Sequence, residues 1–88
     1  VQRAADMIRI LYFASLRERL GSTDETLQEH PRTIADLRAQ LAARGGVWGE
    51  VFAGGQRVLA AVNQEMASDG QALQAGDEVG FFPPVTGG

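Results

Sequence analysis

A single helix-like segment with one apolar stripe lies between two groups of short strand-like segments, and this order limits the fold more than any other feature. Ile34, Leu37 and Leu41 recur at intervals of three and four residues, so a helix places them on one face. Thr33 precedes this stripe and Asp36 follows three residues later, which is the spacing of an N-terminal capping box. We therefore expect a helix that begins at Ile34, ends at the next pair of glycines and packs on a sheet.

Five segments have the pattern of β-strands. The first, residues 8–14, alternates and places Ile8, Ile10 and Tyr12 on one face. The nearly apolar run 58–62 is typical of a central strand that is covered on both faces. The remaining strands are expected at residues 25–29, antiparallel to the first strand, at 65–67 and at 78–82.

The segments between the strands carry turn and helix signals. Residues 14–20 tolerate a short helix that Gly21 ends, and Asn63 begins a turn. Three large apolar residues after the main helix are expected to continue the core irregularly under a loop: Trp48, Val51 and Phe52.

The order strand, strand, helix, strand, short strand, strand predicts an α+β protein. It fits the ubiquitin-like β-grasp architecture, in which a small mixed sheet carries one main helix packed on one face. We predict a flexible N-terminal extension at residues 1–6, a β-grasp domain at 7–82 and an extended tail at 83–88. A chain of 88 residues buries only about 60% of its unfolded surface, so we expect no deep catalytic cleft.

The predicted sheet leaves one face without a covering helix. In the last strand, Val79 and Phe81 share one side while Gly80 and Phe82 share the other, so only one phenylalanine faces the helix. With Val79 facing the helix, the exposed apolar set is Leu11, Phe13 and Phe82, joined by Met66. Such a set is typical of a partner-binding surface. The alternatives are a loop that covers this face, or apolar side chains scattered singly as on any protein surface.

The last six residues have an unusual composition for a chain end: Pro83-Pro84-Val85-Thr86-Gly87-Gly88. Six extended residues reach roughly 20 Å, and each proline holds φ near about −65° before any partner binds. The two glycines lack Cβ, so a partner can close a narrow channel around them and approach the carbonyl carbon. This tail suits delivery of a terminal carboxylate to another protein's active site, and the alternative is an ordinary frayed terminus.

Composition excludes several kinds of function. The absence of cysteine removes disulfides, thiol nucleophiles and thiolate metal sites, and a net charge of −3 argues against nucleic-acid binding. No apolar stretch approaches the ~20 residues that cross a bilayer, and residues 1–6 lack the apolar core of a secretory signal. We therefore expect a cytoplasmic protein without a membrane or nucleic-acid partner.

Metal and nucleotide sites are not expected in this chain either. His30 is the single histidine and has no second ligand at metal-binding spacing. The glycine pairs match neither dinucleotide-binding nor Walker patterns, so any ATP is expected to bind a partner.

Three segments resemble the small, sulfur-carrying subunits of molybdopterin synthase: residues 59–64, 76–79 and 81–88. The opening segment 8–21, with Tyr12-Phe13-Ala14, is similar to the same family. The resemblance covers residues 7–88, and the C-terminal octapeptide is its most specific part. This chain departs from the family in its six-residue N-terminal extension and in the glycine-rich region 45–55.

The resemblance implies a two-stage chemistry at the C-terminus. An α-carboxylate is ionised at pH 7 and resists nucleophilic attack, so it must first be activated. In this family an adenylating enzyme related to ubiquitin activators uses ATP to convert the terminal carboxylate, here that of Gly88, into an acyl-adenylate. A sulfur donor protein then displaces AMP and leaves a C-terminal thiocarboxylate.

The resemblance also implies which partners bind this chain. The loaded tail enters the large subunit of molybdopterin synthase, in a heterotetramer of two large and two small subunits, and gives its sulfur to the pterin precursor. The catalytic groups belong to the large subunit, so this chain is a non-catalytic sulfur-donating subunit that binds no cofactor. Gly88 carries the sulfur. The residues expected to contact partners are Gly87, Thr86, Val85, Pro84, Pro83, Phe82, Phe13, Leu11, Met66 and Arg17, and a solvated side chain is an equal alternative for Arg17.

Three other functions are compatible with the sequence. The same thiocarboxylate chemistry serves carriers for thiamine, a sulfur amino acid or a tungsten cofactor. A ubiquitin-like modifier would join its Gly-Gly end to lysines of target proteins. A non-catalytic β-grasp interaction domain would work without Gly87 and Gly88.

Overall fold

Five strands form one mixed sheet in the computed structural model, which describes residues 7–28, 31–54 and 57–84. The strands are β1 (Ile8–Tyr12), β2 (Asp24–Leu27), β3 (Leu59–Val62), β4 (Glu65–Ala67) and β5 (Glu78–Phe82). Their order across the sheet is β2-β1-β5-β3-β4, in which β1 and β5 are parallel and every other pair is antiparallel. The predicted mixed sheet is confirmed.

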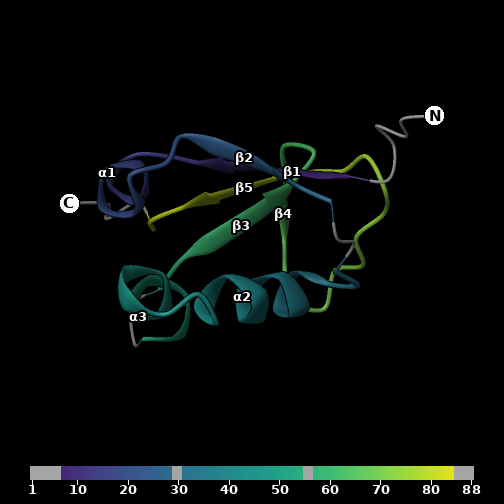
Figure 1. Cartoon of the computed structure of the whole chain (residues 1–88). Helices are drawn as coiled ribbons and strands as arrows, with labels where there is room; N and C mark the ends of the chain where they lie inside the picture. Colours follow the sequence, from purple (N-terminus) through teal and green to yellow (C-terminus); the bar gives the residue numbers. More distant parts are fainter. Residues whose placement is uncertain (1–6, 29–30, 55–56, 85–88) are drawn as a thin grey trace.

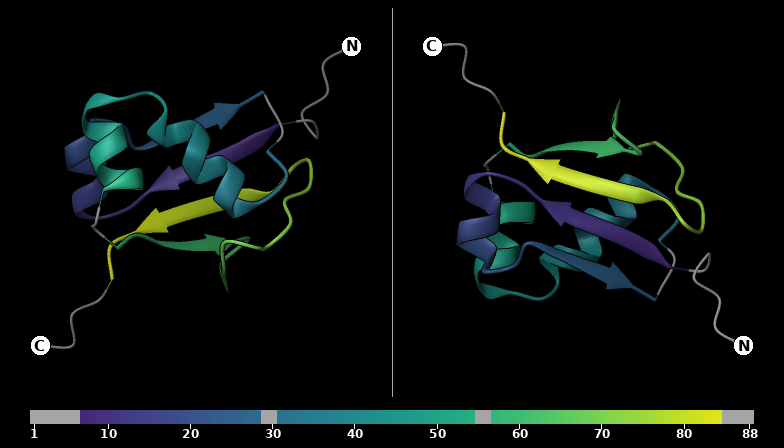
Figure 2. Two further views of the ribbon diagram at one scale, coloured as in Figure 1. Left: turned by 90° about the horizontal axis from the view of Figure 1, so that it is seen from below. Right: turned by 90° about the horizontal axis from the view of Figure 1, so that it is seen from above.

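The helices are α1 (Ser15–Leu20), α2 (Ile34–Ala42) and α3 (Gly46–Ala53). Figure 1 places α2 and α3 together on one side of the sheet. The two views in Figure 2 show these helices in front of the strands from one side and the strands in front from the other. No helix in the described part of the chain is long and apolar enough to cross a membrane.

The predicted main helix is confirmed at its start. Thr33 is extended and its hydroxyl oxygen accepts a hydrogen bond of 3.2 Å from the backbone N–H of Asp36. The helix begins at Ile34, and the stripe of Ile34, Leu37 and Leu41 is completely buried. Burial of this stripe against the sheet, more than helix propensity, stabilises so short a helix.

The strand faces follow the predicted alternation. Ile8, Ile10 and Tyr12 of β1 are buried beneath the helices together with Val79 and Phe81 of β5. Parallel pairing sets Ile10 beside Val79 and Tyr12 beside Phe81, so the two central strands form the floor of the core. Phe82 therefore belongs to the opposite face, as the sequence predicts.

Two local predictions are wrong. Residues 46–53 form the helix α3 and not an irregular loop, because Trp48, Val51 and Phe52 have the three-and-four spacing of a helical stripe. The strand at 59–62 is covered on one face only, since its residues alternate between buried and partly exposed. Its other face carries Leu59 and Ala61, which are partly exposed.

The tail follows β5 at a defined end of the sheet. In Figure 1, β5 ends on the side where α1 and α3 lie, whereas the loop from Ser68 to Asp77 lies at the other end. A turn at Asn63 and Gln64, both with positive φ (51° and 73°), joins β3 to β4 at that other end. Asn63 also accepts a 3.0 Å hydrogen bond from the backbone N–H of Glu78, which fixes the start of β5. Residues 1–6 and 85–88, on which the predicted extension and the end of the tail fall, lie outside the described residues.

Candidate functional site on the free face of the sheet

Strand register gathers apolar residues on the sheet face that carries no helix. Leu11 of β1 lies beside Gly80 of β5, Gly80 beside Ala61 of β3, and Ala61 beside Met66 of β4. Phe82 occupies the same face two residues after Gly80. With Phe13, these residues form what we call the apolar patch: Leu11, Phe13, Ala61, Met66, Gly80 and Phe82.

Phe13 and Met66 are the most exposed members of the patch. Phe13 is 45% exposed and Met66 65%, whereas Leu11 and Phe82 are half-buried. A hollow of about 110 Å³ opens on this face and is lined by Leu11, Phe13, Ala61, Gln64, Glu78, Gly80 and Phe82. Solvent-exposed aromatic and aliphatic groups around a small hollow can receive an apolar side chain of another protein.

The absence of a side chain at Gly80 leaves room for the Phe13 ring. A Cβ on Gly80 would lie 2.8 Å from Cε2 of Phe13, which is closer than such atoms approach one another. The ring of Phe13 therefore lies directly over the backbone of β5. Ala14, the next residue, has φ 56°, so the chain turns sharply here and enters α1.

Polar side chains border the patch. Arg9 of β1 makes a 3.0 Å ion pair with Asp24 of β2, and β-pairing sets Arg9 beside Glu78. Gln64 and Glu78 form part of the hollow's wall. An apolar centre with a polar rim is the usual composition of a protein–protein interface.

The base of the tail adjoins this patch. β5 ends at Phe82, and Pro83 and Pro84 follow as half-buried residues. The carbonyl oxygen of Phe81 accepts a 3.0 Å hydrogen bond from the N–H of Phe13, which ties the end of β5 to the end of β1. The predicted site residues Val85, Thr86, Gly87 and Gly88 lie outside the described residues.

On the helix side of the sheet, a polar triad of Tyr12, Glu25 and Arg44 joins β1, β2 and the segment between α2 and α3. Glu25 of β2 accepts a 2.7 Å hydrogen bond from the Tyr12 hydroxyl and two bonds, of 2.9 and 2.7 Å, from the guanidinium of Arg44. The Arg44 hydrogen bonds hold the pKa of the Glu25 carboxyl below its usual value. Burial, reinforced by the bond to Glu25, raises the pKa of Tyr12, so its hydroxyl stays protonated.

The structure brings together four of the predicted partner-contact residues, Leu11, Phe13, Met66 and Phe82, and sets Pro83 and Pro84 next to them. Arg17 lies exposed on α1, outside the patch. The prediction did not include Gly80 and Ala61, which form the floor of the patch. The available signal for this floor was a glycine and an alanine at positions that face away from the helices.

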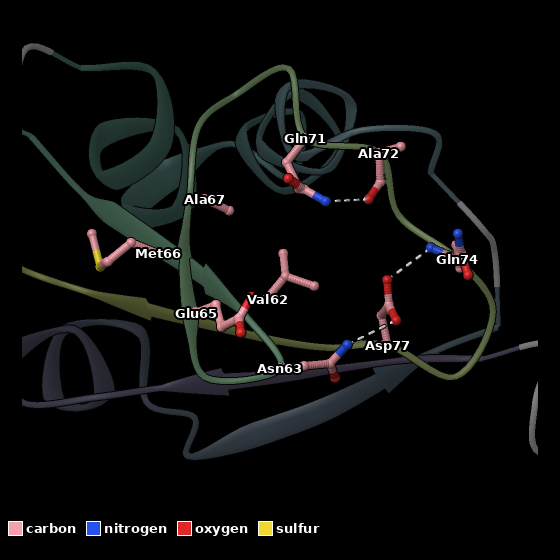
Figure 3. Close-up of a pocket in the computed structure, with 9 residues that line it drawn as sticks. All are labelled: Val62, Asn63, Glu65, Met66, Ala67, Gln71, Ala72, Gln74 and Asp77. Carbon is pink, nitrogen blue, oxygen red and sulfur yellow. Dashed lines mark hydrogen bonds between the residues drawn. The ribbon is translucent and has the colours of Figure 1, made fainter.

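A polar pocket of about 350 Å³ lies at the opposite end of the sheet, between the β3–β4 hairpin and the loop before β5 (Figure 3). Its polar groups largely satisfy one another: Asp77 accepts from the Asn63 side chain at 3.0 Å and from the backbone N–H of Gln74 at 2.8 Å. Among the described residues, no three histidine, aspartate or glutamate side chains lie close enough to hold a metal ion. The pocket's contacts fix the loop and the start of β5.

Comparison with known proteins gives a family for this chain. The model of the ThiS family matches residues 10–88. The molybdopterin synthase sulfur carrier subunit of Escherichia coli (strain K12) is 43% identical over 82 residues, which are 93% of this chain and 100% of that relative.

Solved structures agree with this assignment. The crystal structure of SAMP1 (small archaeal modifier protein 1) from Haloferax volcanii has a TM-score of 0.74 and 29% identity, and the match covers 93% of this chain and 99% of that one. A subunit in the protein–protein complex of subunits 1 and 2 of the molybdopterin-converting factor from Helicobacter pylori has the same fold, with a TM-score of 0.66 and 20% identity over 93% of this chain and 99% of that one. This chain belongs to the ThiS family and, within it, to the group of the molybdopterin synthase sulfur carrier subunits.

Proposed function

We propose that this chain is the sulfur carrier subunit of a molybdopterin synthase and that the carboxylate of Gly88 carries the sulfur. The observation that supports this most strongly is the match to the Escherichia coli sulfur carrier subunit, which extends over the whole length of that relative. The family match also includes the Gly-Gly end of the sequence. A carrier of this kind needs a domain that its partners recognise and a tail that delivers the terminal carboxylate. A β-grasp domain followed by the segment 83–88 fits this need.

Loading of Gly88 requires activation by a separate enzyme. A carboxylate attacks the α-phosphorus of ATP, pyrophosphate leaves, and an acyl-adenylate results. A sulfide equivalent from a sulfur donor protein then attacks the acyl carbon and expels AMP, which leaves a thiocarboxylate. Because the chain has no cysteine, no thiol within it competes for the activated carbonyl. Since activation consumes ATP, we place this step in the cytoplasm.

Transfer takes place in the large synthase subunit. The thiocarboxylate sulfur attacks a carbon of the pterin precursor and displaces an oxygen substituent from it, so that a thioester joins the two molecules. Water then cleaves the acyl–sulfur bond, which leaves the sulfur on the pterin and restores the Gly88 carboxylate. Each carrier delivers one sulfur, so a dithiolene needs two loaded carriers, in keeping with an assembly of two large and two small subunits. The general base and the substrate pocket are contributed by the large subunit, so this chain holds no cofactor.

The apolar patch is the surface we assign to the large subunit. Phe13 and Met66 project from it, and Phe82 joins it to the tail, so a partner that covers the patch also receives Pro83 and Pro84. The Helicobacter pylori fold neighbour is described as a complex with a second subunit, which supports a two-subunit assembly. Arg17, on the adjacent helix α1, is assigned to the edge of a partner contact.

Reconstitution tests this function. The chain, an adenylating enzyme, ATP and isotope-labelled sulfide are combined with the large subunit and the pterin precursor. The label is expected in the pterin product when the wild-type chain is present and absent when Gly88 is deleted. Equal labelling with the deleted chain would contradict the proposal.

A protein modifier is the second candidate, favoured by the similarity to the small archaeal modifier protein. A modifier would leave its C-terminal peptide joined through Gly88 to lysines of other proteins, whereas a carrier would exchange one oxygen of its own terminus for sulfur. Peptide mass spectrometry of cell extracts distinguishes these outcomes. Adducts that depend on Gly88 would establish the modifier function.

A further inference from the structure

Four aromatic rings form a closed cluster under the end of β5. Phe81 stacks on Tyr12 with ring centroids 6.4 Å apart and planes at 15°, and meets the edge of Phe52 at 5.0 Å and 72°. Trp48 contacts the Tyr12 ring edge to face at 5.5 Å and stacks on Phe52 at 6.2 Å. We call Tyr12, Trp48, Phe52 and Phe81 the aromatic cluster; each ring in it contacts two others.

Charged groups hold this cluster from two sides. Arg44 lies over the Trp48 ring at 4.4 Å from its centroid while it binds Glu25, and Glu25 in turn binds the Tyr12 hydroxyl. Arg38 lies 5.5 Å from the centroid of Phe81 and is itself paired with Asp69 at 2.8 Å. Each arginine is thus held over its ring by a carboxylate, which restricts where the ring can lie.

The aromatic cluster lies beneath the end of β5, the strand that leads into Pro83. Phe81 is two residues before Pro83, and its backbone is tied to Phe13 on the neighbouring strand. The rings support β5 from the helix side, while Phe13 rests on Gly80 from the other side. The last residues of β5 are thus held from both faces of the sheet.

Orientation at the base of the tail matters because the reacting atom is several residues away. Six residues span roughly 20 Å when they are extended, so a tilt of about 10° at their base would displace their end by roughly 3 Å. A misplacement of reacting atoms by about 1 Å can cost on the order of a hundredfold in rate. A carrier of this kind therefore benefits from a rigid strand end before the tail.

We propose that Trp48 and Phe52 of α3 are positioning residues for sulfur transfer: through Phe81 they hold the end of β5, from which Pro83 and Pro84 continue. This inference rests on the proposed function. It assigns a role to α3, which lies on the side of the sheet away from the apolar patch and so does not serve that contact surface.

The test compares Phe52→Leu with Ile8→Val. Phe52→Leu removes the ring contacts to Phe81 and Trp48 but keeps an apolar side chain, whereas Ile8 is completely buried at the opposite end of β1. Both chains carry a chemically installed thiocarboxylate at Gly88, so activation is bypassed. The rate of a single sulfur transfer is measured with saturating large subunit, and the dissociation constant is measured separately.

Phe52→Leu is expected to transfer sulfur about tenfold more slowly in the saturated complex, with a dissociation constant within about twofold of wild type. Ile8→Val should change neither quantity. A wild-type transfer rate for Phe52→Leu, or an equal loss for Ile8→Val, would overturn the proposal.

A second measurement needs no sulfur chemistry. The ¹⁵N order parameter of the Phe82 amide is expected to fall in Phe52→Leu and to stay unchanged in Ile8→Val. An unchanged order parameter in both variants would also overturn the positioning role. If the wild-type chain transfers no sulfur at all, the proposed function fails, and the order parameters still decide whether α3 fixes the tail base.

Discussion

At the scale of single residues, the apolar patch depends on a residue with no side chain. Gly80 leaves the space over β5 that the Phe13 ring occupies, and the positive φ of Ala14 turns the chain directly after Phe13. A non-glycine residue in such a conformation costs on the order of 1–3 kcal/mol, and strain of this kind often occurs at functional sites. The strained turn and the exposed ring are adjacent in the chain, which fits a surface shaped for contact.

Phe13→Ala is predicted to weaken binding of the large subunit by about 2 kcal/mol, because an exposed aromatic anchor is lost from the centre of the contact. The free energy of unfolding should change by less than about 1 kcal/mol, since the side chain is 45% exposed. Isothermal calorimetry and denaturant titration measure the two quantities. Val47→Ala, on α3, is the control and should leave binding unchanged. A larger loss of stability than of affinity would show that Phe13 is a core residue.

The faces of these residues were predictable, but their contacts were not. The two-residue period of a strand at residues 8–13 and 78–82 indicates which side chains share a face. The contact of Phe13 with Gly80 depends on the parallel register of β1 and β5, two strands with roughly sixty-five residues between them in the sequence. Local sequence carries no signal for that register.

At the scale of elements, α2 is positioned by its cap. Thr33→Ala removes the acceptor for the Asp36 N–H and is predicted to lower the free energy of unfolding by about 1 kcal/mol. Thr33→Ser keeps a hydroxyl and should retain most of the stability. Denaturant titration of both variants checks this, and equal stability of Thr33→Ala and wild type would exclude a capping role.

The Glu25 triad joins β1, β2 and the segment between α2 and α3, and it predicts a pH dependence. The folded state lowers the pKa of Glu25, so its stabilisation is present above the unfolded pKa of about 4.3 and is lost as pH falls through the lower folded value. Glu25→Gln should therefore cost about 1.5–3 kcal/mol at pH 7 and progressively less below about pH 4.

The exposed Arg9–Asp24 pair supplies the control for this prediction. Its side chains are 57% and 45% exposed, so Asp24→Asn should cost less than about 1 kcal/mol at pH 7. Urea titrations at several pH values compare the two variants. A cost for Glu25→Gln that does not shrink on acidification would contradict the role given to its charge.

The helix α3 shows where element prediction failed. The glycines in and beside the helix, at positions 45, 46, 49 and 54, favour a loop, whereas the spacing of Trp48, Val51 and Phe52 favours a helix. Packing of these three side chains in and against the core outweighs the low helix propensity. The spacing was a local signal for the helix, and tertiary contacts decide between the two conformations.

At the scale of the whole molecule, the topology directs the tail. The first and last strands are parallel neighbours in the middle of the sheet, so the chain leaves the domain from its best-supported strand. The sequence predicted the fold class, the order of the strands and main helix, and the free face, because each follows from local periodicity. It did not predict the two-sided support of β5, which requires α3 and the register of β1 at once.

Deletion of Gly88 is predicted to leave the free energy of unfolding within about 0.5 kcal/mol of wild type, because a terminal glycine has no side chain to bury. Loading with sulfur should be lost completely. Thermal unfolding and a loading assay on the same preparation test both parts. A destabilised deletion variant would mean that the end of the chain supports the fold.

Conversion of the Gly88 carboxylate into a thiocarboxylate is the step on which the proposed function depends. It is measured by the intact mass of the chain after incubation with the adenylating enzyme, ATP and a sulfur donor. We expect a gain equal to the difference between one sulfur and one oxygen atom, confined to the C-terminal peptide and absent without ATP. An unchanged mass, or sulfur found on any other residue, would contradict it.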